Sequence, residues 1–316
     1  MQRSNTLTDL TEAWTGNLRV LAAFALLLTP LLGVAAENAQ AETKPSDDDL
    51  RIRGVFDSAL PRTEKKRSLR LIVHPHLGDL TKRDHIRTAL GFRYGITSRW
   101  EASIETDAYF THGLKQGNFF ADSGFSTLHL GTKYLLGDPL HLGWDTSIGA
   151  DWQRPLGTPP LDVTDGLQHL APFFSLARPL KSHPAWRVFF GGGWDNVSAT
   201  ATKGALDKNE LGDDSVRLFG GVLYERGPLT YTLESSVATT RLTGSTQRDV
   251  YVVRPGIIWV LPQKYTFGSR GKCLLGVALR ASHGAAGTDL GVSAKLRVNF
   301  DFKRLLHRKA PAAPGR

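Results

Sequence analysis

Arginines on strand-like stretches are the residues of this chain that most clearly suggest chemistry. In most of these stretches the residues two positions from the arginine, which would lie on the same face of a strand, are glycine, small polar or charged. The residues between them, on the opposite face, are apolar. A guanidinium group binds carboxylates and phosphates through paired hydrogen bonds, so several guanidinium groups around one space would favour anions. The arginines concerned are Arg70, Arg87, Arg93, Arg187, Arg217, Arg254, Arg280 and Arg297.

Acidic residues and other bases fall on the same faces and could pair across neighbouring strands. This happens if one turn is centred on Thr97 and another on Gly137 and Asp138. Opposite charges on paired strands contribute about 0.2 to 1 kcal/mol. Two interpretations stay open, an interior filled by ion pairs and a solute path lined by arginine. The predicted pairs are Arg93 with Glu101, Arg87 with Asp107, His129 with Asp145 and Lys133 with His141, and Glu234 is a further inward acid.

A hydrolase acting on lipids would need a serine beside a histidine near the rim of the fold. The nearest candidates are the adjacent Ser282 and His283, together with His169 and Ser175. The His-x-Ser spacing common in barrel hydrolases does not occur anywhere in the sequence. A lipid hydrolase is therefore the weakest of the functional alternatives, and we predict no catalytic residue.

Metal binding and redox chemistry have equally little support. His74 and His76 share one strand face, but Pro75 between them is typical of a strand end, so the pair indicates a solvated rim. Cys273 is the only cysteine, which excludes an internal disulfide. It would lie on the same strand face as apolar residues, so we interpret it as a small apolar side chain. We therefore expect neither a metal site nor a cofactor.

The stretch from Asp84 to Phe110 shows which elements must position these side chains. Apolar residues alternate there with charged or small ones on both sides of a short turn. This period of two is that of β-strands, and each run is long enough to cross a bilayer core when tilted. The charges lie at the strand centres, where a membrane barrel holds them inside. The apolar face has Ile86, Leu90, Phe92, Tyr94, Ile96, Trp100, Ala102, Ile104, Ala108 and Phe110.

The same alternation recurs along the chain and predicts about twelve strands, with ten or fourteen as alternatives. In hydrocarbon an open sheet edge leaves backbone groups without partners, so the strands must close on themselves. Short connections alternate, with exceptions, with long ones, as in outer-membrane barrels. The fold class is therefore an all-β, antiparallel, up-and-down transmembrane barrel. The predicted strands are residues 68–76, 86–96, 99–110, 127–134, 141–152, 169–177, 186–194, 216–224, 229–237, 250–261, 273–282 and 291–302.

The regions outside the strands divide the chain further. Arg19 precedes an apolar run that Pro30 interrupts and that ends at the small-x-small triplet Ala39-Gln40-Ala41, which indicates an export signal, with an uncleaved anchor as the alternative. A mixed-charge stretch without periodicity follows, and it is either a periplasmic tail or a peptide tucked into the pore. The predicted segments are 1–41 (signal peptide), 42–66 (periplasmic N-terminal segment), 67–302 (barrel) and 303–316 (basic C-terminal tail).

Composition agrees with an exported barrel. The mean hydropathy of −0.21 is too polar for a bundle of spanning helices. The formal net charge is +9, but the basic residues are spread over strands and loops, so we expect no nucleic-acid partner. Anionic lipopolysaccharide and anionic solutes are the better partners for this charge.

Two short stretches resemble a known family. The sequence Phe92-Arg93-Tyr94-Gly95-Ile96-Thr97-Ser98-Arg99-Trp100-Glu101 is similar to the first-hairpin signature of transporter-like Gram-negative outer-membrane barrels, including the meta-pathway phenol-degradation group. The stretch Leu296–Phe302 resembles the closing strand that the barrel-assembly machinery reads, although a basic tail follows it. The resemblance implies an outer-membrane location and passage or binding of small, hydrophobic solutes, without assigned site residues. Together with the inward arginines, it predicts a passive channel or binding protein for small solutes, anionic or aromatic. A structural or surface-interaction barrel without transport is the alternative.

Overall fold

The computed structural model describes residues 55–78, 85–111, 122–160, 163–200, 213–244, 249–262, 273–284 and 287–301. The predicted signal peptide and the C-terminal tail lie outside these residues. In the part of the chain that the structure describes, no helix is long and apolar enough to cross a membrane.

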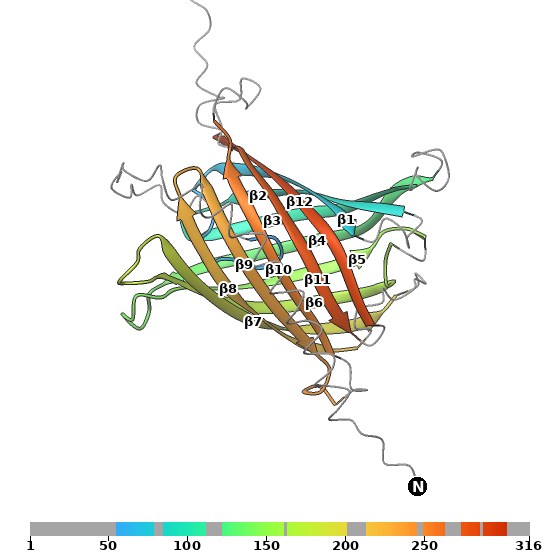
Figure 1. The fold of residues 1–316 in the computed structure, drawn as a ribbon. Coiled ribbons are helices and arrows are strands. Elements are labelled where there is room, and N and C mark those ends of the chain that lie inside the picture. Colours follow the sequence, from blue (N-terminus) through green and yellow to red (C-terminus); the bar gives the residue numbers. More distant parts are fainter. Residues whose placement is uncertain are drawn as a thin grey trace, which may run out of the picture. The chain divides into compact units, whose positions relative to one another are not determined.

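Twelve antiparallel strands form a closed barrel in which each strand pairs with its sequence neighbours and β1 pairs with β12 (Figure 1). The prediction of an all-β, up-and-down barrel of about twelve strands is confirmed. The strands are β1 (Ser68–Gly78), β2 (His85–Gly95), β3 (Trp100–Thr111), β4 (Ser123–Gly137), β5 (Asp145–Pro155), β6 (Leu167–Pro179), β7 (Trp186–Ala199), β8 (Ser215–Arg226), β9 (Leu229–Thr239), β10 (Asp249–Val260), β11 (Cys273–Gly284) and β12 (Gly287–Asp301).

The two ends of the barrel differ in their connections. At the turn end, where β1 begins and β12 ends, the connecting residues are 96–99, 138–144, 180–185, 227–228 and 261–272. At the opposite loop end they are 79–84, 112–122, 156–166, 200–214, 240–248 and 285–286. The loop end thus has most of the long connections, as the sequence predicts, with brief ones after β1 and β11.

Large apolar side chains cover the outside of the barrel. Leu130 and Val277, for example, are 42% and 49% exposed, whereas the residues next to them in sequence point inward. An apolar exterior around a closed sheet is the surface of a barrel that spans a membrane. Aromatic rings join along the turn end, where Trp186 and Tyr224 have centroids 4.8 Å apart and Tyr224 stacks on Tyr231 at 6.2 Å. These rings are arranged as the interfacial girdle that such barrels carry.

The register of the first hairpin differs from the sequence prediction. β2 and β3 pair with Arg93 opposite Ser103 and Gly95 opposite Glu101, so the predicted direct pairs of Arg93 with Glu101 and Arg87 with Asp107 are wrong. The reason lies in the turn, where the Thr97 hydroxyl accepts hydrogen bonds from the next amides and shifts the centre by one residue. Arg93 nevertheless reaches Glu101 diagonally, at 3.7 Å.

The register between β4 and β5 differs as well. Lys133 lies opposite Gly149 and His129 opposite Gln153, so the predicted pairs of His129 with Asp145 and of Lys133 with His141 are wrong. The Asp138 carboxylate accepts hydrogen bonds from two amides of the connecting residues 138–144, which form a longer loop than the predicted tight turn.

Candidate functional site in the barrel lumen

Residues 55–66, here called the lumen segment, lie inside the barrel. The backbone N–H of Phe56 donates a hydrogen bond to Glu234 Oε2 of β9 at 3.2 Å. The hydroxyl of Ser175, on β6, donates to the carbonyl of Ala59 at 2.6 Å. Partners on strands so far apart around the sheet place the segment across the interior. The sequence leaves two alternatives for this region, a periplasmic tail and a peptide inside the pore. The described residues of the lumen segment lie inside the pore.

Basic side chains of the barrel hold the backbone of the lumen segment. Lys133 Nζ donates to the carbonyls of Leu60 and Arg62 at 3.0 and 2.9 Å. Lys295 Nζ, on β12, donates to the carbonyl of Phe56. A buried carbonyl without a partner is costly, so these ammonium groups stabilise the backbone of the lumen segment where strand pairing does not.

Two ion pairs join the lumen segment to the barrel, of which the pair of Arg70 with Glu64 is fully buried and the pair of Arg254 with Asp57 is partly exposed at Asp57. Arg70 Nε lies 2.8 Å from Glu64 Oε1, and both side chains are almost fully buried. Arg254 Nη2 lies 2.5 Å from Asp57 Oδ2. Removing one partner of a buried pair typically costs about 3 to 5 kcal/mol, because the other charge is left without compensation. These pairs therefore fix both ends of the segment.

An apolar cluster closes the turn end beneath the charged lumen. Val55, Phe56 and Leu60 pack there against inward-facing apolar side chains of the barrel wall. The strand pattern predicts polar, glycine or charged residues on the inward face, and this prediction is wrong near the turn end. The barrel residues of the cluster are Ala177, Phe189, Leu223, Ile258, Leu274 and Ala278.

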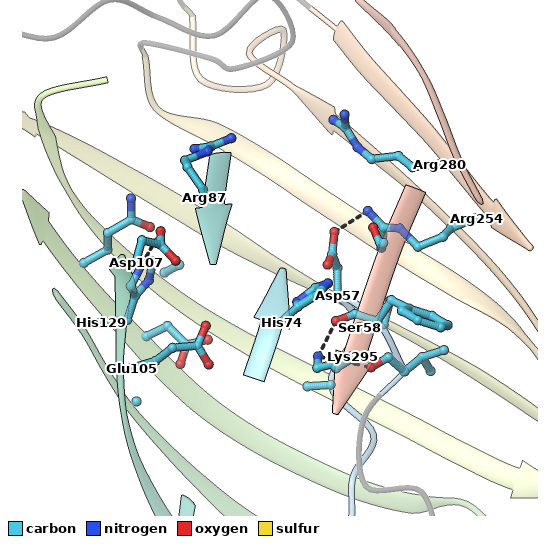
Figure 2. A pocket seen from close by; sticks show the side chains of 18 of the residues that line it. Asp57, Ser58, His74, Arg87, Glu105, Asp107, His129, Arg254, Arg280 and Lys295 are labelled. Atoms are coloured by element: carbon cyan, nitrogen blue, oxygen red, sulfur yellow. Dashed lines mark hydrogen bonds and ion pairs between the residues drawn. The ribbon is translucent and has the colours of Figure 1, made fainter. Parts of the chain in front are cut away.

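A cavity of about 520 Å³ remains in the lumen on the loop side of this cluster. Figure 2 shows Arg254, Arg280 and Lys295 on one side of it, and Asp107 beside His129 on the other. Five of the seven basic lining residues come from β8, β10, β11 and β12, but acidic side chains lie among them, since Asp57 pairs with Arg254 and Asp289 with Arg280. The basic lining residues are Arg87, Arg93, Arg217, Arg254, Arg280, Lys295 and Arg297, and the acidic ones are Asp57, Glu105, Asp107, Asp151, Asp195 and Asp289.

The residues predicted from sequence to line the lumen occupy three environments. The first group lines the cavity, the second binds or surrounds the lumen segment, and the third lies near the turn end. The first group is Arg87, Arg93, Asp107, His129, Arg217, Arg254, Arg280 and Arg297. The second is Arg70, Glu101, Lys133 and Glu234. The third is Asp145, which pairs with Arg62 at 3.1 Å, and Arg187, next to the first residue of β7.

Within the cavity, several predicted residues already have protein partners. Arg280 Nη1 lies 3.5 Å from Asp289 Oδ2, His129 Nε2 lies 3.3 Å from Asp107 Oδ2, and Arg297 donates to a backbone carbonyl of the lumen segment. Ion pairs therefore occupy much of the lumen around the lumen segment, while charged groups also line a cavity on the loop side.

Sequence reasoning missed part of the cavity. Asp57 and Asp289 lie outside the charged positions that strand alternation selects, because Asp57 belongs to the lumen segment and Asp289 is the third residue of β12, ahead of the predicted start of that strand at residue 291. The sequence suggests His169 only as a hydrolase candidate, but its two ring nitrogens lie 2.8 Å from Asp165 and 2.9 Å from Asp195. The alternation of His169 with the outward Leu170 is the sequence signal that could have placed this histidine in the lumen.

The remaining hydrolase candidates bind other groups. Ser175 donates to the lumen segment, and His283 Nδ1 lies 3.0 Å from the hydroxyl of Thr288. Cys273 is buried, with a free thiol. No group of three or more metal-ligating side chains occurs among the described residues.

Comparison with known proteins gives similarity at the level of solved structures. No family model matches the sequence, and no curated protein is similar to it. An outer-membrane channel from Pseudomonas putida F1 is 12% identical, with a TM-score of 0.48, and the alignment covers 82% of this chain and 99% of that one. The KdgM porin (8% identity, TM-score 0.41, coverage 74% and 98%) and the NanC porin (11%, 0.42, 73% and 98%) are also similar. The KdgM porin was also solved in complex with disordered oligogalacturonate.

The closed pairing of β1 with β12 and the outward apolar side chains establish the fold of this chain independently of these similarities.

Proposed function

We propose that the chain is an outer-membrane channel that binds small anionic solutes in its lumen and conducts them passively. An even-stranded closed barrel with an apolar exterior is the architecture with which single bacterial chains cross the outer membrane. In such barrels the termini and short turns face the periplasm, which makes the loop end of this barrel extracellular.

The observation that carries this proposal is the cavity on the loop side of the lumen segment. Arg87, Arg217 and Arg280 line it, and each lies close to the loop end of its strand. A solute that enters from this end meets guanidinium groups before it meets the lumen segment. Because guanidinium pairs with carboxylate and phosphate, small anions are the solutes that this entrance favours.

Ion selectivity in a planar bilayer tests the proposal. We expect current in symmetrical salt and a reversal potential in a potassium chloride gradient that shows preference for chloride. Arg280→Gln should lower the chloride-over-potassium permeability ratio by up to about fivefold, since a unit charge at 4 Å contributes about 1 kcal/mol in water. Arg99→Gln, which changes an exposed turn residue, is the matched control and should leave the ratio unchanged. Preference for potassium in the unmodified protein would contradict the proposal.

The lumen segment favours a second candidate, a structural or surface-interaction barrel without transport, because it fills the turn end. A reversible lock separates the two. Ala59→Cys with Ser175→Cys, in a Cys273→Ala background, places a thiol on each of the two residues that are joined when the Ser175 hydroxyl donates to the Ala59 carbonyl. A channel should lose current on oxidation and regain it on reduction. A barrel that stays silent in both states, with an intact fold, would be structural.

A further inference from the structure

An apolar groove lies on the outer face of the barrel, apart from the lumen. Trp100, Tyr134, Ile148 and Phe174 form its walls, and all four side chains are between 40% and 49% exposed. Its volume is about 710 Å³. The floor is made of small or short side chains that point outward on neighbouring strands, namely Thr132 on β4, Ala150 on β5 and Pro172 on β6.

The sequence builds this depression by placing short side chains between large ones on one outward face. Ala150 lies opposite both Thr132 and Pro172 in the sheet, so three short side chains form one row across three strands. Trp100 is held beside this row, because its indole N–H donates to the hydroxyl of Thr132 at 2.8 Å. The groove is therefore a built feature of the outer surface, with one aromatic wall fixed by a hydrogen bond.

A basic residue marks the turn-end side of the groove. Arg178 lies four residues beyond Phe174 on β6, which is about 13 Å along a strand. Its guanidinium lies 4.7 Å from the centroid of the Trp144 ring, and Trp144 makes an edge contact with Phe190. Among the described residues no carboxylate pairs with Arg178. A cation held on an aromatic ring near the turn end lies where lipid headgroups meet the barrel.

We infer that this face binds a phospholipid of the periplasmic leaflet, with one acyl chain in the groove and the phosphate against Arg178. The groove lies on the surface that faces hydrocarbon, which makes an acyl chain its natural occupant. The distance of about 13 Å between Phe174 and Arg178 matches a headgroup and the upper half of its chain. The charge of Arg178 favours an anionic headgroup such as phosphatidylglycerol. The inference concerns the outer wall and does not depend on solute passage.

Native mass spectrometry of the detergent-purified full chain with added phosphatidylglycerol tests this inference. We expect one lipid to stay bound at low lipid-to-protein ratio. Arg178→Gln should weaken its binding by about tenfold, the loss expected for one charge-assisted hydrogen bond. Ala150→Trp, which fills the floor of the groove, should remove the lipid.

Matched variants keep the test decisive. Arg226→Gln changes another arginine at the turn end of an outward row, and Ala294→Trp enlarges another outward alanine, on β12. Both should bind phosphatidylglycerol as the unmodified chain does. The heat-dependent shift in gel mobility confirms that each variant forms a barrel. Equal loss in the matched variants, unchanged binding in Ala150→Trp, or retention of lipopolysaccharide in place of phosphatidylglycerol would overturn the inference.

Discussion

The carboxylate of Asp57 accepts a 2.5 Å hydrogen bond from the guanidinium of Arg254, although 197 positions separate the two residues in the sequence. Arg254 also lies 3.5 Å from Glu234, and the backbone N–H of Asp57 donates to Glu234 at 3.2 Å. The lumen segment and strands β9 and β10 therefore share one cluster of charges. Whatever weakens this cluster should loosen the segment.

Arg254→Gln should release the lumen segment and raise the conductance. The change leaves Glu234, which is 2% exposed, without its cation, so the barrel should also lose about 3 to 5 kcal/mol of unfolding free energy. Single-channel current and urea titration measure the two effects. Arg217→Gln, in the same cavity, should not raise the conductance and should cost less unfolding free energy, and an unaltered conductance in Arg254→Gln would show that the segment does not limit the current.

Gly95→Ala should displace the lumen segment by steric contact. A Cβ at this position would lie 2.7 Å from the carbonyl oxygen of Glu64 and closer still to that of Lys65, which are backbone atoms that cannot rotate away. We expect faster proteolysis of residues 55–66 in the folded barrel, followed by mass spectrometry. In the control Gly124→Ala, the new Cβ meets only the tip of Tyr109, so the proteolysis rate should be that of the unmodified protein.

Phe56→Ala tests whether the apolar cluster stabilises the barrel. Phe56 is 2% exposed, and the loss of a buried phenyl ring typically costs about 3 to 5 kcal/mol. Phe125→Ala removes the same ring from the outer surface, where Phe125 is 56% exposed, and should cost much less. Equal urea midpoints for the two variants would mean that the cluster contributes nothing to stability.

Leu130→Arg and His129→Arg compare the two faces at neighbouring positions of β4. Leu130 points outward, and an arginine near the bilayer midplane should cost about 2 to 4 kcal/mol of unfolding free energy in lipid vesicles. His129 points inward beside Asp107, which can pair with the new guanidinium, so its replacement should be tolerated. Equal tolerance of both changes would refute the assignment of the faces.

The strand pattern could be read from the sequence because a closed sheet in a membrane must alternate at nearly every position. Ile104 and Leu130 face hydrocarbon, while the charged residues beside them have to turn inward. This constraint applies to each strand separately. The face on which a residue lies can therefore be predicted without knowing which strands are paired with its own. It is strong enough to predict all twelve strands and their order.

Register and lumen contents depend on interactions that alternation does not encode. The Thr97 hydroxyl sets the position of the first turn, and a one-residue shift of its centre moves every cross-strand partner by two positions. The inward Phe189 and Leu223 depart from the predicted polar face because they pack against the apolar side chains of a segment that has no periodicity. Lys133 likewise binds backbone carbonyls from residues more than 70 positions earlier, which no local pattern reveals.

The lumen segment also constrains the order in which the molecule is built. Lys295 holds the carbonyl of Val55 across 240 positions, and its strand seals the cylinder against β1, which follows the segment directly. Arg297, on the same strand, also donates to the carbonyl of Val55. The contacts that hold the N-terminal side of the lumen segment are therefore complete only once β12 has paired with β1, so the seam of the barrel and the position of its inner peptide depend on the same strand.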